Sequence, residues 1–278
     1  MIIDFHTHVL PDEFRNARPR FLQADPTFKA LFSRPSTRIA TADDLLAEMD
    51  ANGVDRAVTL GYGWQDPGVA RISNDYLLAA AARSKGRLVP FCSVSPTWGK
   101  KAIEEVERCA AAGARGIGEL HPDTQGFDIA DEATMQPLMS AAEALGLIVT
   151  THSSEPVGHD YPGKGTVTPE HLLSLATSFP RVRLVFAHWG GGLAFYSLMP
   201  EVERSVRRVW FDSAATTLLY DAGVYRAVAT ATGADRILFG SDFPLVSLAR
   251  ALDDVGAASL EPDESAAALG GNAATLLS

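Results

Sequence analysis

The feature that most constrains the fold is a regular alternation of short apolar runs with helix-like segments along most of the 278-residue chain. From residue 41 onward, segments with apolar side chains every three or four residues usually end at a glycine or proline and lead into a β-rich run. Counting the first run, this pattern predicts eight strands, at residues 2–6, 54–61, 87–94, 114–120, 147–154, 182–192, 209–214 and 236–244.

The spacing and character of these strands favour a (β/α)8 TIM barrel over a doubly wound sheet. After the first strand, strand starts recur roughly every 26 to 35 residues, which is the length of a βα unit. The strands are nearly continuous apolar runs, as expected for a parallel sheet whose outer face is covered by helices. We therefore expect one α/β barrel domain over residues 1–278.

Residues 11–40 interrupt the pattern as a long insertion after the first strand. The segment is rich in Pro, Arg and Phe, and it contains Phe14, Phe21, Phe28 and Phe32. These aromatic side chains could form a lid over a site or a homodimer contact. They could equally form a small subsidiary core beneath a surface loop.

Composition excludes several classes of function. The chain is 46% hydrophobic with a formal net charge of −10 and has no Lys/Arg-rich run, which argues against nucleic acids and anionic membranes as partners. No apolar stretch approaches the length of a membrane span, and the chain opens with a strand rather than a signal peptide. The two cysteines, Cys92 and Cys109, form no CxxC motif. We expect a cytoplasmic protein that acts on a small molecule.

The first predicted strand leads into His6-Thr7-His8. Residues i and i+2 of a strand point to the same face, so the two imidazoles would lie side by side. This is a metal-ligand spacing, although a hydrogen-bonded histidine pair at a strand end would have the same sequence.

Other polar residues stand at the carboxyl ends of later predicted strands. In a barrel these ends meet at one rim, where active sites of this fold lie. Such a convergence of metal-competent side chains favours a metal site over a chance histidine pair. The residues that would share the rim with His6 and His8 are Glu119, His121, His152, His188 and Asp242.

The motifs HTH, His152, AHWGGG around His188, and FGSDFP around Asp242 occur in the same order as in the amidohydrolase superfamily. The chain resembles the amidohydrolase-2 branch of that superfamily, which includes aminocarboxymuconate-semialdehyde decarboxylase. The resemblance implies a distorted (β/α)8 barrel with one or two metal ions. It makes His6, His8, His152 and Asp242 metal ligands and places His188 near the substrate. Glu119 stands where binuclear members often carry a carboxylated lysine, and we expect it to be a further ligand.

The chemistry of this residue set suggests a hydrolase. Imidazole nitrogens and carboxylates suit Zn²⁺ or another first-row divalent ion, and bound zinc lowers the pKa of water to about 7. Asp242 would accept the proton of that water, and His188 would hydrogen-bond the developing oxyanion. We expect hydrolysis of an amide, ester or lactone. His121 and Trp189 are the expected substrate contacts, with His121 otherwise supporting a metal ligand.

A nonoxidative decarboxylase of an aromatic or unsaturated carboxylic acid would use the same ligands. Such an enzyme should need an arginine for the substrate carboxylate, and no arginine immediately follows a strand that carries these ligands. That absence, with Glu119, favours hydrolysis. A non-enzymatic binding protein is disfavoured because each polar position that the chemistry requires is occupied.

Overall fold

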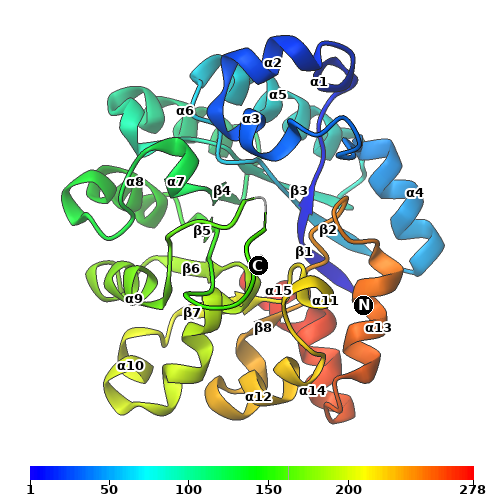
Figure 1. The fold of residues 1–278 in the computed structure, drawn as a ribbon, viewed down its shortest axis with the longest axis vertical. Helices are drawn as coiled ribbons and strands as arrows, with labels where there is room; N and C mark the ends of the chain where they lie inside the picture. The colour runs from blue at the N-terminus through cyan, green and yellow to red at the C-terminus, as the bar shows by residue number, and fades with distance from the viewer. Residues whose placement is uncertain (162) are drawn as a thin grey trace.

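The computed structural model describes residues 1–161 and 163–278, and there eight parallel strands pair in chain order around a barrel (Figure 1). The circle closes where Phe5 N–H donates to the Phe239 carbonyl at 2.7 Å and Thr7 pairs with Phe243. The predicted (β/α)8 barrel is therefore confirmed. The strands are β1 (Ile3–His8), β2 (Arg56–Leu60), β3 (Leu88–Cys92), β4 (Gly116–Leu120), β5 (Ile148–Thr151), β6 (Arg183–Phe186), β7 (Val209–Asp212) and β8 (Ile237–Leu238).

Helices surround the strands on the outside of the barrel (Figure 1). The α-helices are α1 (Asp12–Asn16), α2 (Arg18–Ala24), α3 (Pro26–Phe32), α4 (Ala42–Asn52), α5 (Pro67–Arg83), α6 (Lys100–Ala111), α7 (Pro122–Gln125), α8 (Glu132–Ala144), α9 (Pro169–Ser178), α10 (Pro200–Ser205), α11 (Thr216–Leu219), α12 (Gly223–Thr232), α13 (Leu248–Ala257), α14 (Pro262–Ala266) and α15 (Asn272–Leu276). Tighter or wider turns are η1 (Pro96–Trp98), η2 (His188–Leu198), η3 (Ala234–Arg236) and η4 (Ala267–Gly271). Among the described residues, no helix is long and apolar enough to cross a membrane.

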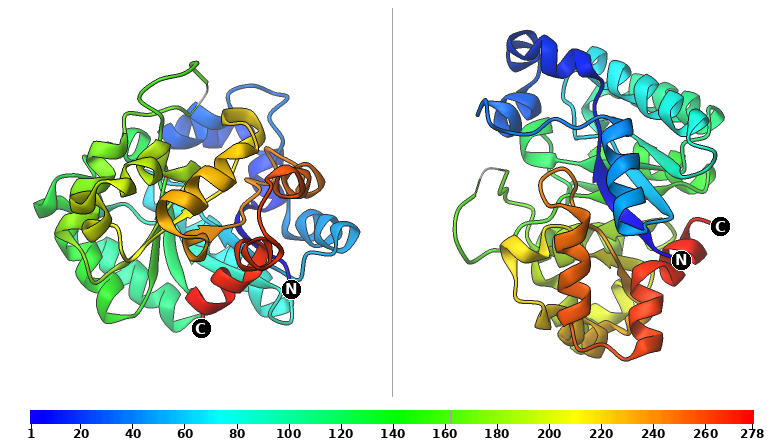
Figure 2. Two further views of the ribbon diagram at one scale, coloured as in Figure 1. Left: turned by 90° about the horizontal axis from the view of Figure 1, so that it is seen from below. Right: turned by 90° about the vertical axis from the view of Figure 1, so that its right-hand side faces the viewer.

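The barrel interior is filled by apolar side chains and is closed at its amino end. Strand residues such as Phe5, Leu60 and Phe91 form one buried cluster with Leu276 and Leu277 at the carboxyl end of the chain. Figure 2 shows both chain ends on this side of the barrel. The opposite rim, at the carboxyl ends of the strands, is where a site can open.

The insertion after β1 folds as α1, α2 and α3. Its four phenylalanines are buried to 2% exposure or less and pack with Trp64 in a cluster of their own. Phe14 and Phe21 stack with ring centroids 4.0 Å apart. The subsidiary-core interpretation is confirmed for these side chains.

Strand pairing is irregular in the two strands that carry the first expected ligands. The register of β1 against β2 shifts between Asp4 and Thr7, and that of β4 against β5 shifts between Ile117 and Leu120. Such irregularities redirect side chains and are common beside active sites. They are the local distortion of an otherwise regular barrel.

Candidate metal centre

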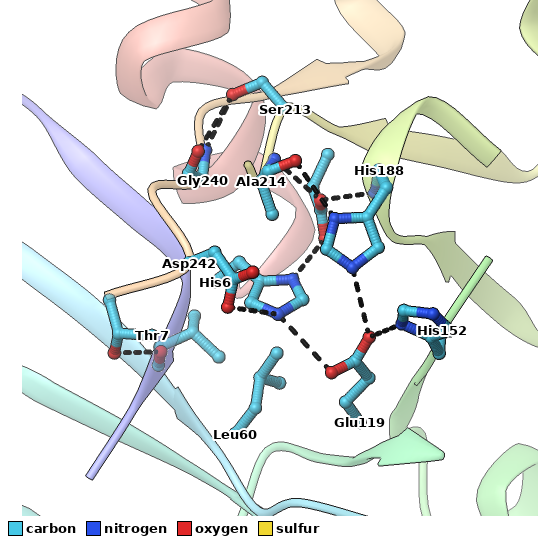
Figure 3. A network of polar contacts seen from close by, with 12 residues as sticks. His6, Thr7, Leu60, Glu119, His152, His188, Ser213, Ala214, Gly240 and Asp242 are labelled. Carbon is cyan, nitrogen blue, oxygen red and sulfur yellow. Dashed lines mark hydrogen bonds and ion pairs between the residues drawn. The ribbon is translucent and has the colours of Figure 1, made fainter. Parts of the chain in front are cut away.

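Side chains from distant parts of the chain meet at the carboxyl rim of the barrel, and Figure 3 shows His6, Glu119, His152, His188 and Asp242 there. Together with His8, which lies 3.5 Å from Glu119, we call them the His–carboxylate cluster. They come from β1, β4 and the segments that follow β5, β6 and β8. All six are buried or nearly so, the most exposed being Asp242, whose side chain is 14% exposed. The members are His6, His8, Glu119, His152, His188 and Asp242.

The first half of the cluster joins the two histidines of β1 to both carboxylates. His6 Nε2 and His8 Nε2 lie 3.1 Å apart. Glu119 Oε2 is 3.6 Å from the former nitrogen and 3.5 Å from the latter. Asp242 Oδ1 is 3.8 and 3.6 Å from the same two atoms. Two nitrogens and two oxygens therefore surround one small volume.

The second half is built on the other oxygen of Glu119. Glu119 Oε1 lies 3.1 Å from His152 Nδ1 and 3.6 Å from His188 Nε2. Ligand atoms of Glu119, His152 and His188 all fall within 4.8 Å of one another, as do those of His6, His8 and Glu119. One carboxylate thus bridges two groups of potential ligands.

Hydrogen bonds from the far side of the His6, His8 and His188 rings determine which nitrogen faces the cluster. His6 Nδ1 donates to Asp212 Oδ2 at 2.8 Å, and His188 Nδ1 donates to the Ala214 carbonyl at 3.0 Å. His8 Nδ1 similarly donates to the Leu60 carbonyl. A histidine that donates from Nδ1 presents the lone pair of Nε2, which is the arrangement of metal-bound imidazoles.

The electrostatics of the cluster favour a positive charge at its centre. Burial alone would lower the pKa of His6, but the carboxylates of Asp212 and Glu119 outweigh burial and hold that pKa well above its usual range. Burial would raise the pKa of Glu119, but His6, His152 and His188 hold it well below its usual range. A proton or a cation can meet this demand, so the residues present fit a divalent ion.

Asp4 holds the segment that carries Asp242. The fully buried Asp4 accepts hydrogen bonds from Ser241 Oγ at 2.5 Å and from the Ser241 N–H at 3.0 Å. The next N–H, of Asp242, donates to the His6 carbonyl at 2.9 Å. Asp242 adopts φ 68°, a left-handed conformation that non-glycine residues seldom take outside functional sites. These bonds fix Asp242 beside the β1 histidines.

A cavity of about 840 Å³ opens above the cluster. Its polar lining includes His8, Glu119, His121, His152, His188 and Asp242. The insertion contributes Phe32, Arg34 and Arg38, and the segments after β7 and β8 contribute apolar residues such as Leu219 and Leu245. The insertion therefore forms part of the cavity wall.

The structure separates the two expected substrate contacts. His121 lines the cavity, where its ring stacks on that of His152 with centroids 4.4 Å apart. Trp189 is fully buried in the barrel wall, its indole N–H donates to Thr216 Oγ1 at 2.9 Å, and it is not among the lining residues. The sequence expectation for Trp189 is corrected accordingly, because the backbone turns the side chain after His188 into the core.

Sequence reasoning missed several residues at this rim. Asp212 closes β7 and accepts hydrogen bonds from the His6 ring and from the N–H groups of His188 and Ala214. The sequence feature that could have identified Asp212 is an aspartate at the end of an otherwise apolar strand. Arg34 and Arg38 gave no such signal, since nothing in an irregular insertion shows which side chains reach the site.

Comparison with known proteins identifies the family. The sequence profile described as amidohydrolase matches residues 3–278. The chain belongs to the amidohydrolase family. It is an enzyme of that superfamily, and the predicted resemblance to its amidohydrolase-2 branch is confirmed.

Two curated relatives are similar in sequence. One is 2-amino-3-carboxymuconate-6-semialdehyde decarboxylase of Dictyostelium discoideum, 23% identical over 87% of this chain and 81% of that protein. The other is L-fucono-1,5-lactonase of Burkholderia ambifaria, 28% identical over 57% of this chain and 59% of that protein. The first match is the broader one.

Solved structures share the fold over nearly the whole chain. 5-Carboxyvanillate decarboxylase of Sphingomonas paucimobilis superposes with a TM-score of 0.80 at 20% identity, over 99% of this chain and 98% of that one. A dihydroxybenzoic acid decarboxylase of Polaromonas sp. JS666, solved with bound manganese, gives a TM-score of 0.74 at 18% identity, over 99% and 96%.

Proposed function

We propose that this protein is a metal-dependent, nonoxidative decarboxylase of a small aromatic or unsaturated carboxylic acid. The observation that carries the proposal is the cavity, which combines the His–carboxylate cluster with two arginines and apolar walls. A planar carboxylic acid suits such a lining, because its carboxylate can contact the arginines or a bound ion while its apolar part contacts the apolar walls. The decarboxylases among the relatives support the same reaction.

The expectation of amide, ester or lactone hydrolysis is wrong. The broader of the two curated matches is a decarboxylase, and solved structures of aromatic-acid decarboxylases superpose on 99% of this chain. The lactonase matches only 57% of it. The ligand set alone could not have separated the reactions, since both use histidines and carboxylates around one ion.

From the sequence, decarboxylation is disfavoured because no arginine immediately follows a ligand-bearing strand. Arg34 and Arg38 line the cavity from the insertion after β1 rather than from a segment after a ligand-bearing strand. Within residues 1–161 and 163–278, neither guanidinium forms an ion pair or donates a hydrogen bond, and that of Arg38 lies over the Phe243 ring, 5.0 Å from its centroid. Two positive charges are therefore available to a substrate carboxylate.

We assign His6, His8, His152 and Asp242 as the residues that would hold a divalent ion, with Glu119 bridging to the second half of the cluster. A bound ion would supply Lewis-acid attraction for the substrate's carboxylate. The manganese in a structural neighbour and the carboxylate content of the cluster support Mn²⁺ as well as Zn²⁺. Metal analysis of the purified protein gives the identity of the ion and whether one or two bind.

Asp242 is the proposed proton donor, because its carboxyl lies at the floor of the cavity. In the proposed reaction, electrons of the substrate's unsaturated system bond a proton at the carbon that bears the carboxylate. The electron pair of the breaking C–C bond then restores the unsaturated system as CO₂ leaves. His188, 3.6 Å from Glu119, would orient the substrate beside Asp242. Asp242 regains its proton from solvent.

The proposed function is tested by incubating Mn²⁺-loaded and Zn²⁺-loaded protein with aromatic and unsaturated carboxylic acids, lactones and amides. CO₂ release and hydrolysis are measured separately. We expect CO₂ from at least one acid and none with the His6→Ala/His8→Ala double variant. Hydrolysis of a lactone or amide without CO₂ release from any acid would refute the proposal.

A further inference from the structure

His121 occupies a position that its surroundings fix tightly. It follows β4, and its N–H donates to Gln125 Oε1 at 2.9 Å while its carbonyl accepts from the Gln125 N–H at 3.0 Å. Gln125 is buried and also donates to the carbonyls of Trp64 and Val94. A Cβ at Gly63 would lie 2.6 Å from the His121 nitrogen, so this approach requires glycine. The place of His121 is thus held from both sides.

The side chain at this fixed position has no polar partner. The residue is 5% exposed, and among the described residues neither Nδ1 nor Nε2 of the ring has a hydrogen-bond partner. The ring packs nearly parallel to that of His152, with 13° between the planes. Each of the four histidines in the His–carboxylate cluster has a polar contact to one of its ring nitrogens. His121 is the exception at the cavity floor.

A buried imidazole without hydrogen-bond partners destabilises the folded protein. Such a residue is useful only if a bound ligand supplies the missing hydrogen bonds. A neutral imidazole has one N–H donor and one acceptor, and at His121 neither ring nitrogen is satisfied by the described residues. Each buried polar atom without a hydrogen-bond partner lowers the stability of the folded protein. Phenylalanine would fill the same space without that cost. The imidazole is explained if a ligand in the cavity provides the missing partner.

We propose that His121 determines substrate specificity by forming a hydrogen bond with a hydroxyl substituent of the carboxylic acid. This inference rests on the proposed function for the class of acid. A hydroxyl both donates and accepts, as a neutral imidazole does, whereas a second carboxylate only accepts and an alkyl group does neither. The preferred substrates are therefore hydroxylated aromatic or unsaturated acids, with the hydroxyl near the ring of His121.

The test compares ligand binding to the metal-loaded wild type and to His121→Phe, which keeps a flat ring against His152. Titration calorimetry is performed with benzoate, 3-hydroxybenzoate and 4-hydroxybenzoate, leaving out the 2-hydroxy acid because its hydroxyl could contact the ion directly. We expect the wild type to bind one hydroxybenzoate about tenfold more tightly than benzoate, the usual value of one hydrogen bond. His121→Phe should bind benzoate as before and lose the preference.

Stability gives a second, independent measurement. Because His121→Phe removes two unsatisfied polar atoms, its midpoint of chemical unfolding should equal or exceed that of the wild type at unchanged metal content. A lower midpoint would reveal a structural partner and overturn the proposal. It is also overturned if the wild type shows no hydroxyl preference, binds none of the benzoates, or shares its preference with the variant. CO₂ release, scored separately, tests decarboxylation whatever the outcome here.

Discussion

At the scale of single residues, the candidate centre depends on side chains that orient other side chains. Asp212 is the clearest case, because its fully buried carboxylate accepts hydrogen bonds from the His6 ring and from two backbone N–H groups. Asp4 does the same for Ser241 and the backbone of His6. The geometry of the cluster is therefore set one layer behind the residues that face the cavity.

Asp212→Asn should weaken metal binding without unfolding the barrel. The amide can still accept from a backbone N–H, but it cannot accept the His6 Nδ1–H as a charged carboxylate does. Loss of such a supporting group typically lowers metal affinity by about 10- to 100-fold. Competition with a chromophoric chelator measures this, with Asp253→Asn on the surface of α13 as the control. Equal affinities in wild type and Asp212→Asn would contradict the orienting role.

Asp242→Asn should separate metal binding from turnover. The amide keeps one carbonyl oxygen and the shape of the side chain, so the remaining ligands should retain most of the metal. It cannot deliver a proton, and general acid catalysis is typically worth about 10²–10⁴ in rate. We expect the loss in kcat rather than in KM for CO₂ release. A variant that holds metal and turns over at the wild-type rate would exclude Asp242 as proton donor.

At the scale of elements, neighbouring βα units are tied together beside the rim. Glu105 on α6 accepts from Asn74 Nδ2 on α5 at 2.8 Å and from Arg108 Nε at 2.8 Å. The side chain of Asn74 also contacts the end of β3, where it donates to the Ser93 carbonyl and accepts from the Ser93 N–H. This chain of contacts joins two helices to a strand whose carboxyl end lies at the cavity rim.

Glu105→Gln should destabilise the protein in a pH-dependent way. Burial would raise the pKa of Glu105, but the hydrogen bonds from Arg108 and Asn74 outweigh it and hold the pKa below its usual value of 4.5. The stabilisation is therefore present above that pH and disappears as the pH falls through the lower, folded-state pKa.

We expect the free energy of unfolding of Glu105→Gln to be about 1 kcal/mol lower than that of the wild type at pH 7, and the difference to be smaller at pH 3. Denaturant titrations at both pH values measure the difference. Glu104→Gln, on the exposed side of the same helix, is the control and should change neither value. A difference that persists unchanged at pH 3 would show that packing rather than charge is responsible.

At the scale of the whole molecule, the barrel was predictable and the wall of its site was not. The repeated alternation of strand and helix determines the eight-stranded barrel, and the rim position of His6, His8, Glu119, His152 and Asp242 follows from it. Whether the Trp189 side chain points into the core and whether Arg38 reaches the cavity depend on backbone turns outside the regular helices and strands. The start of α5 at Pro67 likewise depends on Asp66 in the preceding loop, whose side chain caps the helix by accepting from the Val69 N–H.

Removal of the metal should leave the barrel folded. The interior cluster of Phe5, Phe91 and Leu238 and the layer beneath the helices do not include the metal-facing side chains. We expect the chelated protein to keep its far-UV circular dichroism spectrum and to unfold several degrees lower, as linkage to a bound ion requires. A chelated protein that loses its helical signal would show that the ion is needed for folding.

The closure of β1 against the segment after β8 has a consequence for the order of events during synthesis. The ion pair between His6 and Asp212 spans 206 residues, and the bond between Asp4 and Ser241 spans 237. A growing chain exposes the HTH motif first and obtains the carboxylates that orient it only when the last strands have left the ribosome. The histidines of the HTH motif therefore lack the carboxylate that orients them until most of the protein has been synthesised. Metal binding at the candidate centre would in this way be deferred until the barrel is nearly complete, and a prematurely terminated chain would have no finished site in which to trap an ion.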